Sequence, residues 1–204
     1  MKRNGISVVF FGPDGCGKTS VANGLISALA DEFNSKNGLH CHWKPVPQRK
    51  GDVVTKSNPH SEPIRNSFIS ILYFAYHLLP FFWGWIIYVK PALKKNGLVI
   101  IDRYYYDFFV DLRRYRLNIP NWIVRFGYVF VNKPDIVFCL DADPEVLQER
   151  KMEVSFEECV RQRNAYRALA EELSNGYVID AAQSLDCVVA DVQTIILQHS
   201  VDLA

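Results

Sequence analysis

Short apolar runs recur along the chain and are separated by longer segments of mixed polarity. The first, Ile6–Phe11, is rich in β-branched and aromatic residues, which is typical of a parallel strand covered on both faces. Comparable runs follow at 40–43, 98–101, 135–140 and 177–179. Because each gap between runs can hold a helix, the alternation predicts an α/β fold with a five-stranded parallel sheet and helices on both faces.

Residues that typically begin or end helices fall in these gaps. Asp143 and Pro144 fit an N-cap followed by a first-turn proline. Ser155 and Glu158 form the pattern of a capping box. Gly176 stands where a glycine is expected to terminate a helix.

Length and composition narrow the class of protein. The chain has 204 residues, 49% of them hydrophobic, and can therefore bury a substantial core. No internal repeat appears, and the longest polar stretch, 44–63, is too short to separate two domains, so one domain is expected. With 23 Lys and Arg residues against 22 Asp and Glu residues, the net charge of +1 is too small to hold a polyanion. We therefore expect no nucleic-acid partner.

The cysteines and the N-terminus predict a cytoplasmic location. The 5 cysteines are scattered and no pair of them has metal-ligand spacing, so reduced thiols are expected. The apolar stretch that follows the basic N-terminus ends at Gly12, which is too early for a signal peptide. We therefore expect no secretion.

The strongest motif is segment 12–19, Gly-Pro-Asp-Gly-Cys-Gly-Lys-Thr, which fits the P-loop pattern G-x-x-x-x-G-K-[ST] between a predicted strand and a predicted helix. Its glycines let successive backbone N–H groups face phosphates, and the helix dipole adds positive charge. Lys18 would reach the β- and γ-phosphates of ATP, and Thr19 would offer its hydroxyl to Mg²⁺. Nucleotide contacts are expected from Gly12, Asp14, Gly15, Cys16, Gly17, Lys18, Thr19 and Ser20.

A second motif follows the apolar run at 98–101, where Asp102 and Arg103 end the predicted strand. Functional residues of α/β sheets lie at the carboxyl ends of strands. Asp102 can hold Mg²⁺ or its water, and Arg103 can bind a phosphate through its planar guanidinium. The alternative is a surface Asp–Arg pair that caps the next helix.

These motifs resemble the thymidylate kinase family of P-loop nucleoside monophosphate kinases. The matching segments are 11–19, 90–93 and 99–104, with weaker matches at 140–146, 149–150 and 178–184. The resemblance implies a three-layer P-loop NTPase fold and an ATP- and Mg²⁺-dependent transfer of the γ-phosphate to a nucleoside monophosphate. It also implies a single P-loop kinase domain over residues 1–204, with a short lid around 150–156.

The resemblance further implies roles for individual residues. Lys18 and Arg150 are expected to neutralise the transferring phosphate. Asp102 and Thr19 are expected to serve the metal, while Arg103 holds the acceptor phosphate for in-line attack. The mechanism requires no covalent nucleophile.

The resemblance also bears on the adenine end of the nucleotide. It makes Ala182 and Gln183 candidates for the wall of the adenine site. It makes Arg150 a candidate ligand of the ATP phosphates, although a solvated helix end is an equally good interpretation of this arginine.

The acceptor half departs from the family pattern. Segment 72–89 contains no Lys or Arg, although thymidylate kinases usually carry an arginine in the corresponding helix. Segment 107–112 replaces the polar groups that the family offers to the base, so thymidine monophosphate is expected to be a poor acceptor. The basic cluster at 113–116 fits either a site for an anionic acceptor or a solvated turn paired with Asp107 and Asp111.

Two other functions also fit the sequence. The first is a kinase of the same fold with a sugar or lipid-linked acceptor. The second is a nucleotide-dependent switch or scaffold. Segment 132–135 matches the guanine-specificity pattern N-K-x-D, but it precedes the predicted fourth strand instead of following it, so we interpret the match as coincidental.

Segment 68–89 carries no charged residue and is long enough to cross a bilayer as a helix. A single crossing would put the P-loop and Asp102 on opposite sides of the membrane, so no transmembrane span is expected. Pro80 and Gly84 are expected to divide the segment into two helices. We expect these helices to form core or a homodimer face, with peripheral contact to a membrane or a lipid-like acceptor as the alternative.

Overall fold

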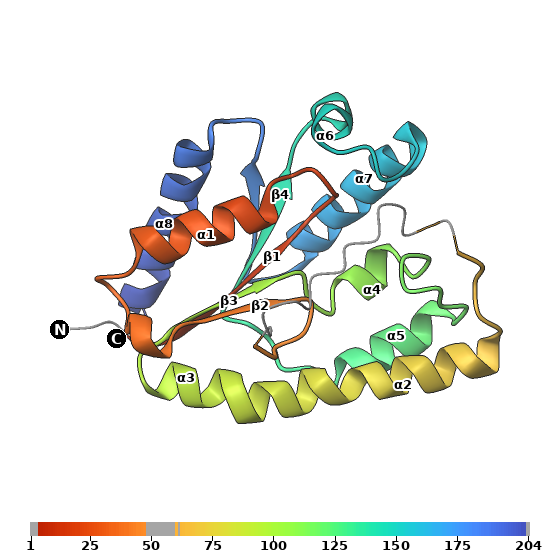
Figure 1. The fold of residues 1–204 in the computed structure, drawn as a ribbon, viewed down its shortest axis with the longest axis horizontal. Helices are drawn as coiled ribbons and strands as arrows, with labels where there is room; N and C mark the ends of the chain where they lie inside the picture. The colour runs from red at the N-terminus through yellow and green to blue at the C-terminus, as the bar shows by residue number, and fades with distance from the viewer. Residues whose placement is uncertain (1–3, 48–59, 61, 203–204) are drawn as a thin grey trace.

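The computed structural model describes residues 4–47, 60 and 62–202. Its centre is a parallel five-stranded sheet in the order β2-β3-β1-β4-β5 (Figure 1). The strands are β1 (Ile6–Phe11), β2 (Leu39–His42), β3 (Leu98–Asp102), β4 (Ile136–Asp141) and β5 (Gly176–Asp180). Each predicted strand is found within one or two residues of its expected bounds, so the predicted sheet is confirmed.

Helices cover both faces of this sheet (Figure 1). They are α1 (Lys18–Ala28), α2 (Ser67–Gly84), α3 (Lys90–Lys94), α4 (Asp107–Val110), α5 (Asn121–Tyr128), α6 (Pro144–Arg150), α7 (Phe156–Glu172) and α8 (Leu185–Asp202). A short 3₁₀ turn, η1, lies at Ser35–Asn37.

Alternation along the strands sends neighbouring side chains into two separate cores. Val8 and Phe10 of β1 pack with α1 and α8 on one face. Val9 and Phe11 pack with α2, α4, α5 and α7 on the other. The result is the three-layer arrangement that the sequence predicts.

The central position of β1 decides where the site forms. This strand pairs with both β3 and β4, and Phe10 lies opposite Asp102 in the register. The carbonyl of Phe10 accepts a hydrogen bond from the backbone N–H of Arg103 at 2.8 Å. Because the strands are parallel, the P-loop that follows β1 lies beside the end of β3.

The predicted division of segment 68–89 at Pro80 and Gly84 is wrong. Helix α2 passes through both residues, continues as a π-helical turn, η2 (Trp85–Val89), and runs directly into α3. Pro80 removes only one backbone donor, and packing of Phe81 against Trp43 and Tyr104 helps to maintain the helix. Gly84 instead allows the helix to lie close to the backbone of Pro45, because a Cβ at position 84 would lie 2.5 Å from the carbonyl oxygen of Pro45.

One side of α2 packs against aromatic residues that follow β2 and β3, and the other carries exposed apolar side chains. The helical stretch Ser67–Lys94 is long and apolar enough to cross a membrane, and 28% of its most apolar window is buried within the protein. Helix α5 lies beside α2, since a Cβ on Gly127 would come within 2.9 Å of the Phe74 ring. We call the exposed surface of these elements the apolar face; it includes Phe68, Leu72, Tyr76, Leu79, Trp83, Ile87, Trp122 and Phe126.

The predicted helix caps and terminators are only partly confirmed. Ser155 caps α7 by accepting a hydrogen bond from the backbone N–H of Glu158, which confirms the cap. Asp143 occupies the N-cap position of α6, but its carboxylate makes no capping bond and instead pairs with Arg163 at 3.1 Å. Gly176 terminates no helix. It begins β5, where a Cβ would lie 2.2 Å from the carbonyl oxygen of Ala170.

Candidate active site

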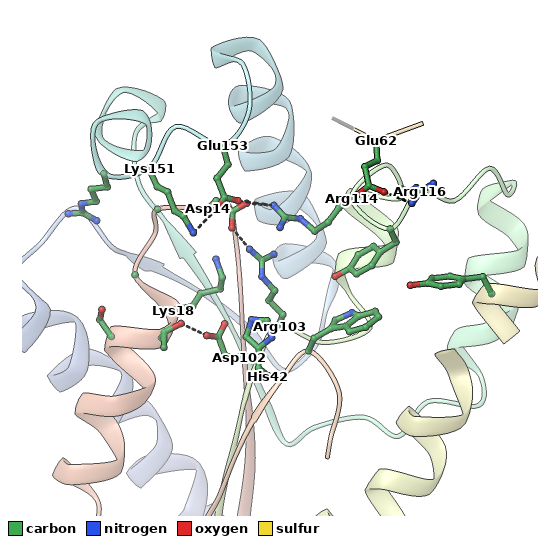
Figure 2. Close-up of a pocket in the computed structure, with 18 of the residues that line it drawn as sticks. Asp14, Lys18, His42, Glu62, Asp102, Arg103, Arg114, Arg116, Lys151 and Glu153 are labelled. Atoms are coloured by element: carbon green, nitrogen blue, oxygen red, sulfur yellow. Dashed lines mark hydrogen bonds and ion pairs between the residues drawn. The ribbon is translucent and has the colours of Figure 1, made fainter. Parts of the chain in front are cut away.

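A cavity of about 660 Å³ opens at the carboxyl ends of β1, β2 and β3 (Figure 2). Its lining joins the P-loop to the ends of β2 and β3, the start of α2, the loop after α4 and the segment between α6 and α7. The predicted residues that line it are Asp14, Gly15, Gly17, Lys18, Thr19, Ser20, Asp102, Arg103 and Arg150.

The P-loop has the backbone conformation that its glycines permit. Gly12, Gly15 and Gly17 have φ angles of 141°, 85° and 87°, in the region that side chains disfavour. The ammonium of Lys18 is buried inside the loop and donates to the carbonyl oxygens of Gly12 and Pro13 at 3.0 and 2.7 Å. The loop therefore wraps a cation at the N-terminus of α1, which is the arrangement that binds phosphates.

Cys16 is buried within this loop, outside the lining of the cavity. Burial raises the pKa of its thiol, and the nearby Lys18 ammonium, 3.3 Å from the sulfur, does not offset that effect. Cys16 is thus a thiol at neutral pH and a small packing residue, and no described cysteine forms a disulfide.

Thr19 and Asp102 meet at the edge of the P-loop, as a shared metal site requires. The Thr19 hydroxyl donates to Asp102 Oδ2 at 2.5 Å. The other carboxylate oxygen, Oδ1, is buried and has no hydrogen-bond partner among the described residues. A hydroxyl and an unsatisfied carboxylate oxygen at a phosphate-binding loop fit Mg²⁺, which prefers oxygen ligands.

Asp102 and Arg103 do not form the alternative surface pair. Both residues are buried, and Arg103 turns away from Asp102 to pair with Asp107 at 2.8 Å and with Asp14 (Figure 2). The backbone of Arg103 is left-handed, with φ of 68°, a strained conformation that is typical of functional sites. Asp107 also accepts hydrogen bonds from the hydroxyls of Tyr115 and Tyr166, at 3.1 Å each.

Asp14 lies between two guanidinium groups. Its carboxylate accepts from Arg103 and from Arg114, each through a terminal nitrogen. Burial raises the pKa of Asp14, but the charges of Arg103, Lys18 and Arg114 outweigh it and hold the pKa well below its usual range. The carboxylate is therefore ionised at neutral pH.

The residues of the basic cluster at 113–116 differ in their surroundings. Arg113 is exposed, whereas Arg114 and Arg116 both line the cavity. Arg116 pairs with Glu62 and donates to the carbonyl oxygen of Pro63 at 2.9 Å. The cluster is thus divided between the site and the solvent.

The far end of the cavity is aromatic and was missed by the sequence reasoning. Trp43 stacks on Tyr115 with ring centroids 4.9 Å apart. The Arg65 guanidinium lies over the ring of Tyr73 at 4.0 Å and donates to the carbonyl oxygen of Tyr115 at 2.8 Å. The position of Trp43 directly after β2 was the available signal, because strand ends line α/β sites.

Of the residues expected to contact ATP beyond the P-loop, only Arg150 reaches the cavity. Arg150 lines the cavity and donates to the carbonyl oxygen of Ala181 at 2.8 Å. Ala182 and Gln183 are exposed in the adjoining loop and do not line this cavity. Lys151, which the sequence reasoning did not select, also lines it and pairs with Glu153 at 2.5 Å.

The comparison with known proteins agrees with this geometry. The family model described as "Thymidylate kinase" matches residues 10–192. The chain belongs to the thymidylate kinase family. As a member of this family it is a P-loop kinase, a transferase that uses ATP, which confirms the predicted enzyme class.

Individual members of the thymidylate kinase family are similar over most of their length. The probable thymidylate kinase of Staphylothermus marinus is 28% identical over 98% of both chains. The thymidylate kinase of Malacoplasma penetrans is 30% identical over 72% of this chain and 67% of its own. The crystal structure of thymidylate kinase from Ehrlichia chaffeensis has a TM-score of 0.65 at 19% identity, covers 95% of this chain and 99% of its own, and shows that the fold is shared.

Proposed function

We propose that this kinase transfers the γ-phosphoryl group of ATP to a nucleoside monophosphate. The observation that carries the proposal is that one cavity joins the P-loop lysine, Lys18, to the buried Arg103 and the partly buried Arg114. Such a cavity can hold a donor and an acceptor phosphate side by side, which in-line transfer requires. Family membership favours a nucleotide acceptor over a sugar or lipid-linked acceptor.

On the donor side, the P-loop N–H groups and Lys18 would bind the β- and γ-phosphates. Lys18 would release the two P-loop carbonyls that it contacts and turn to the phosphate oxygens. Arg150 would add positive charge at the transferring group, and the loop with Ala182 and Gln183 would border the adenine, which is supported by the bond from Arg150 to Ala181.

Thr19 and Asp102 would hold Mg²⁺ through the hydroxyl and the unsatisfied carboxylate oxygen. The bound ion supplies neutralisation of phosphate charge. The protein side chains would contribute by orienting the substrates. Arg103, which is fixed by its ion pair with Asp107, would orient the acceptor phosphate toward the donor. No side chain needs to form a covalent intermediate.

On the acceptor side, the aromatic end of the cavity is suited to a base. The Trp43 and Tyr115 pair and the Tyr73 ring offer flat apolar surfaces, and Arg65 and Arg116 offer donors. Thymidine monophosphate is the first acceptor to test because the relatives are named for thymidylate. The absence of Lys and Arg from 72–89 still predicts that it binds weakly.

We further propose a single domain over 1–204 whose segment 150–156 acts as a short lid, supported by the position of Lys151 and Glu153 at the cavity.

The apolar face would form a homodimer of a cytoplasmic enzyme, because so much exposed aromatic surface is unfavourable in water. Sedimentation equilibrium would test this. A monomer that binds anionic vesicles would instead support peripheral membrane contact, and resistance to alkaline extraction would indicate a transmembrane helix.

A phosphotransfer screen tests the function directly. Purified protein is incubated with Mg²⁺ and ATP and each common nucleoside monophosphate, with phosphosugars as the comparison set. We expect transfer to at least one nucleotide, absent in the Lys18→Ala variant. Transfer to a phosphosugar alone would overturn the nucleotide acceptor, and GTP used in preference to ATP would overturn the donor. The guanine-type match at 132–135 precedes β4 and does not support GTP.

A further inference from the structure

We propose that Arg114 is a second ligand of the acceptor phosphate, acting beside Arg103, and that Asp14 competes with that phosphate for both guanidinium groups. The inference rests on the proposed function and names a binding residue in its site. The roles derived from the P-loop and Asp102–Arg103 motifs do not include Arg114.

The two arginines converge on one oxyanion. Arg103 donates through Nη2 to Asp14 Oδ1, and Arg114 donates through Nη2 to Asp14 Oδ2. They arrive from different segments, the end of β3 and the loop after α4, and Figure 2 shows the carboxylate between them. Guanidinium groups bind carboxylate and phosphate oxygens with the same planar geometry, so a pair that brackets a carboxylate can also bracket a phosphate.

Arg114 is held in this position by its own loop. Its backbone N–H donates to Asp111 Oδ1 at 3.0 Å, and its Nε lies 3.4 Å from Asp111 Oδ2. Asp111 is itself buried and accepts a hydrogen bond from the Gln162 side chain at 3.1 Å. The guanidinium therefore enters the cavity from a rigid base, which a ligand for a small anion needs.

Arg114 also retains unused donor capacity. Its side chain is 16% exposed and lines the cavity. Its remaining acidic neighbour, Glu153, lies 3.7 Å from Nη2 and is itself paired with Lys151. Because this partly exposed side chain lines the cavity, its terminal nitrogens can donate to a phosphate oxygen there.

Arg113 offers a matched control. It has the same charge, lies one residue earlier in the same loop and is exposed instead of lining the cavity. A general change in charge would affect both positions equally, whereas a direct phosphate contact would affect only Arg114.

The test compares Arg114→Ala and Arg114→Lys with Arg113→Ala. The five common nucleoside monophosphates are titrated into wild-type protein by calorimetry, and the tightest binder is then measured on each variant beside its parent nucleoside. We expect Arg114→Ala to weaken the monophosphate by about 10- to 100-fold and to leave the nucleoside unchanged. Arg114→Lys should recover part of the loss, because lysine keeps the charge but not the fork, and Arg113→Ala should match wild type.

Kinetic measurements on the same variants distinguish the role of Arg114 from the proposed kinase function. Arg114→Ala should raise the KM for the acceptor with little change in the KM for ATP. Equal loss for nucleotide and nucleoside, or equal effects at Arg113 and Arg114, would overturn the role of Arg114. Wild-type protein that binds a monophosphate but transfers nothing to it would refute the proposed function, while the calorimetric comparison would still decide the role of Arg114. If Arg114→Ala does not fold, Arg114→Lys carries the same comparison.

Discussion

Replacing Asp14 by asparagine tests how the charged cluster is held together. The change keeps the shape of the side chain and removes the negative charge that lies between Arg103 and Arg114. All three side chains are largely buried, with exposed fractions of 9%, 9% and 16% for Asp14, Arg103 and Arg114. Water therefore cannot replace the lost partner fully, and the folded state should be destabilised.

The size of the effect follows from the partners that remain. Removing one member of a buried ion pair typically costs about 3–5 kcal/mol. Arg103 retains Asp107 at 2.8 Å, and Arg114 retains Asp111 at 3.4 Å, so each arginine keeps a carboxylate. We therefore expect a loss of about 2–3 kcal/mol in the free energy of unfolding. For a chain of this length the Tm would fall by about 4–12 °C.

The contribution of the Asp14 carboxylate to folding stability depends on pH. The folded pKa of Asp14 is depressed below its usual value of 3.8, so the ionised carboxylate stabilises the fold above pH 3.8. That contribution is lost as the pH falls further. The difference between wild type and Asp14→Asn should thus be full at pH 7 and shrink below pH 4.

Urea unfolding of both proteins at pH 7 and at pH 3 measures these differences, with Asp31→Asn, at an exposed carboxylate, as the control. Inorganic phosphate at ten times its Kd for Asp14→Asn should stabilise that variant by about 1.4 kcal/mol, and the same concentration should stabilise wild type less. A loss under about 0.5 kcal/mol at pH 7, the size of an ordinary surface substitution, would refute this reasoning. A loss of equal size at both pH values would also refute it.

The other predictions concern the donor site, the acceptor and the aromatic core. Lys18→Ala should reduce phosphotransfer by several powers of ten with an unchanged circular dichroism spectrum, and near-normal turnover would contradict the kinase assignment. Asp102→Asn should weaken calorimetric ATP binding more with Mg²⁺ than without it, and equal losses would make Asp102 structural. Thymidine monophosphate should show a high KM, and a low-micromolar value would show that the departures in 72–89 do not matter. Burial and the charges of Lys44 and Arg65 lower the pKa of His77 to about 4, so stability should fall as the pH drops from 6.5 to 4, by at most about 1.4 kcal/mol per pH unit. An unchanged pH profile in His77→Gln would contradict this.

Several features could be predicted because they depend on neighbours in sequence. The backbone of the P-loop is set by glycines within one short loop, so segment 12–19 predicted its conformation directly. The apolar runs identified the strands, because a strand covered on both faces needs apolar residues in succession. The position of Asp102 and Arg103 at the end of such a run placed them at the site.

The sequence-based predictions were wrong where tertiary packing overrides the local conformational preference of a residue. Pro80 and Gly84 disfavour a helix locally, yet α2 passes through both because Phe74 and Phe81 on one of its sides are buried in the core. Gly176 resembles a helix terminator, but the close approach of Ala170 is what requires a glycine there. In both cases the deciding contact is with a residue that no local pattern indicates.

The sequence by itself determined the sheet, the P-loop and the family. Only the tertiary structure decided that Arg114 and not Arg113 enters the cavity, that Asp14 joins two arginines about a hundred positions away along the chain, and that Trp43 stacks on Tyr115. The physical reason is that a helix or strand repeats its preference every few residues, whereas contacts between distant loops depend on how helices pack on the sheet. No periodicity in the chain encodes that packing, and the contacts of Asp14, Arg114 and Trp43 depend on it.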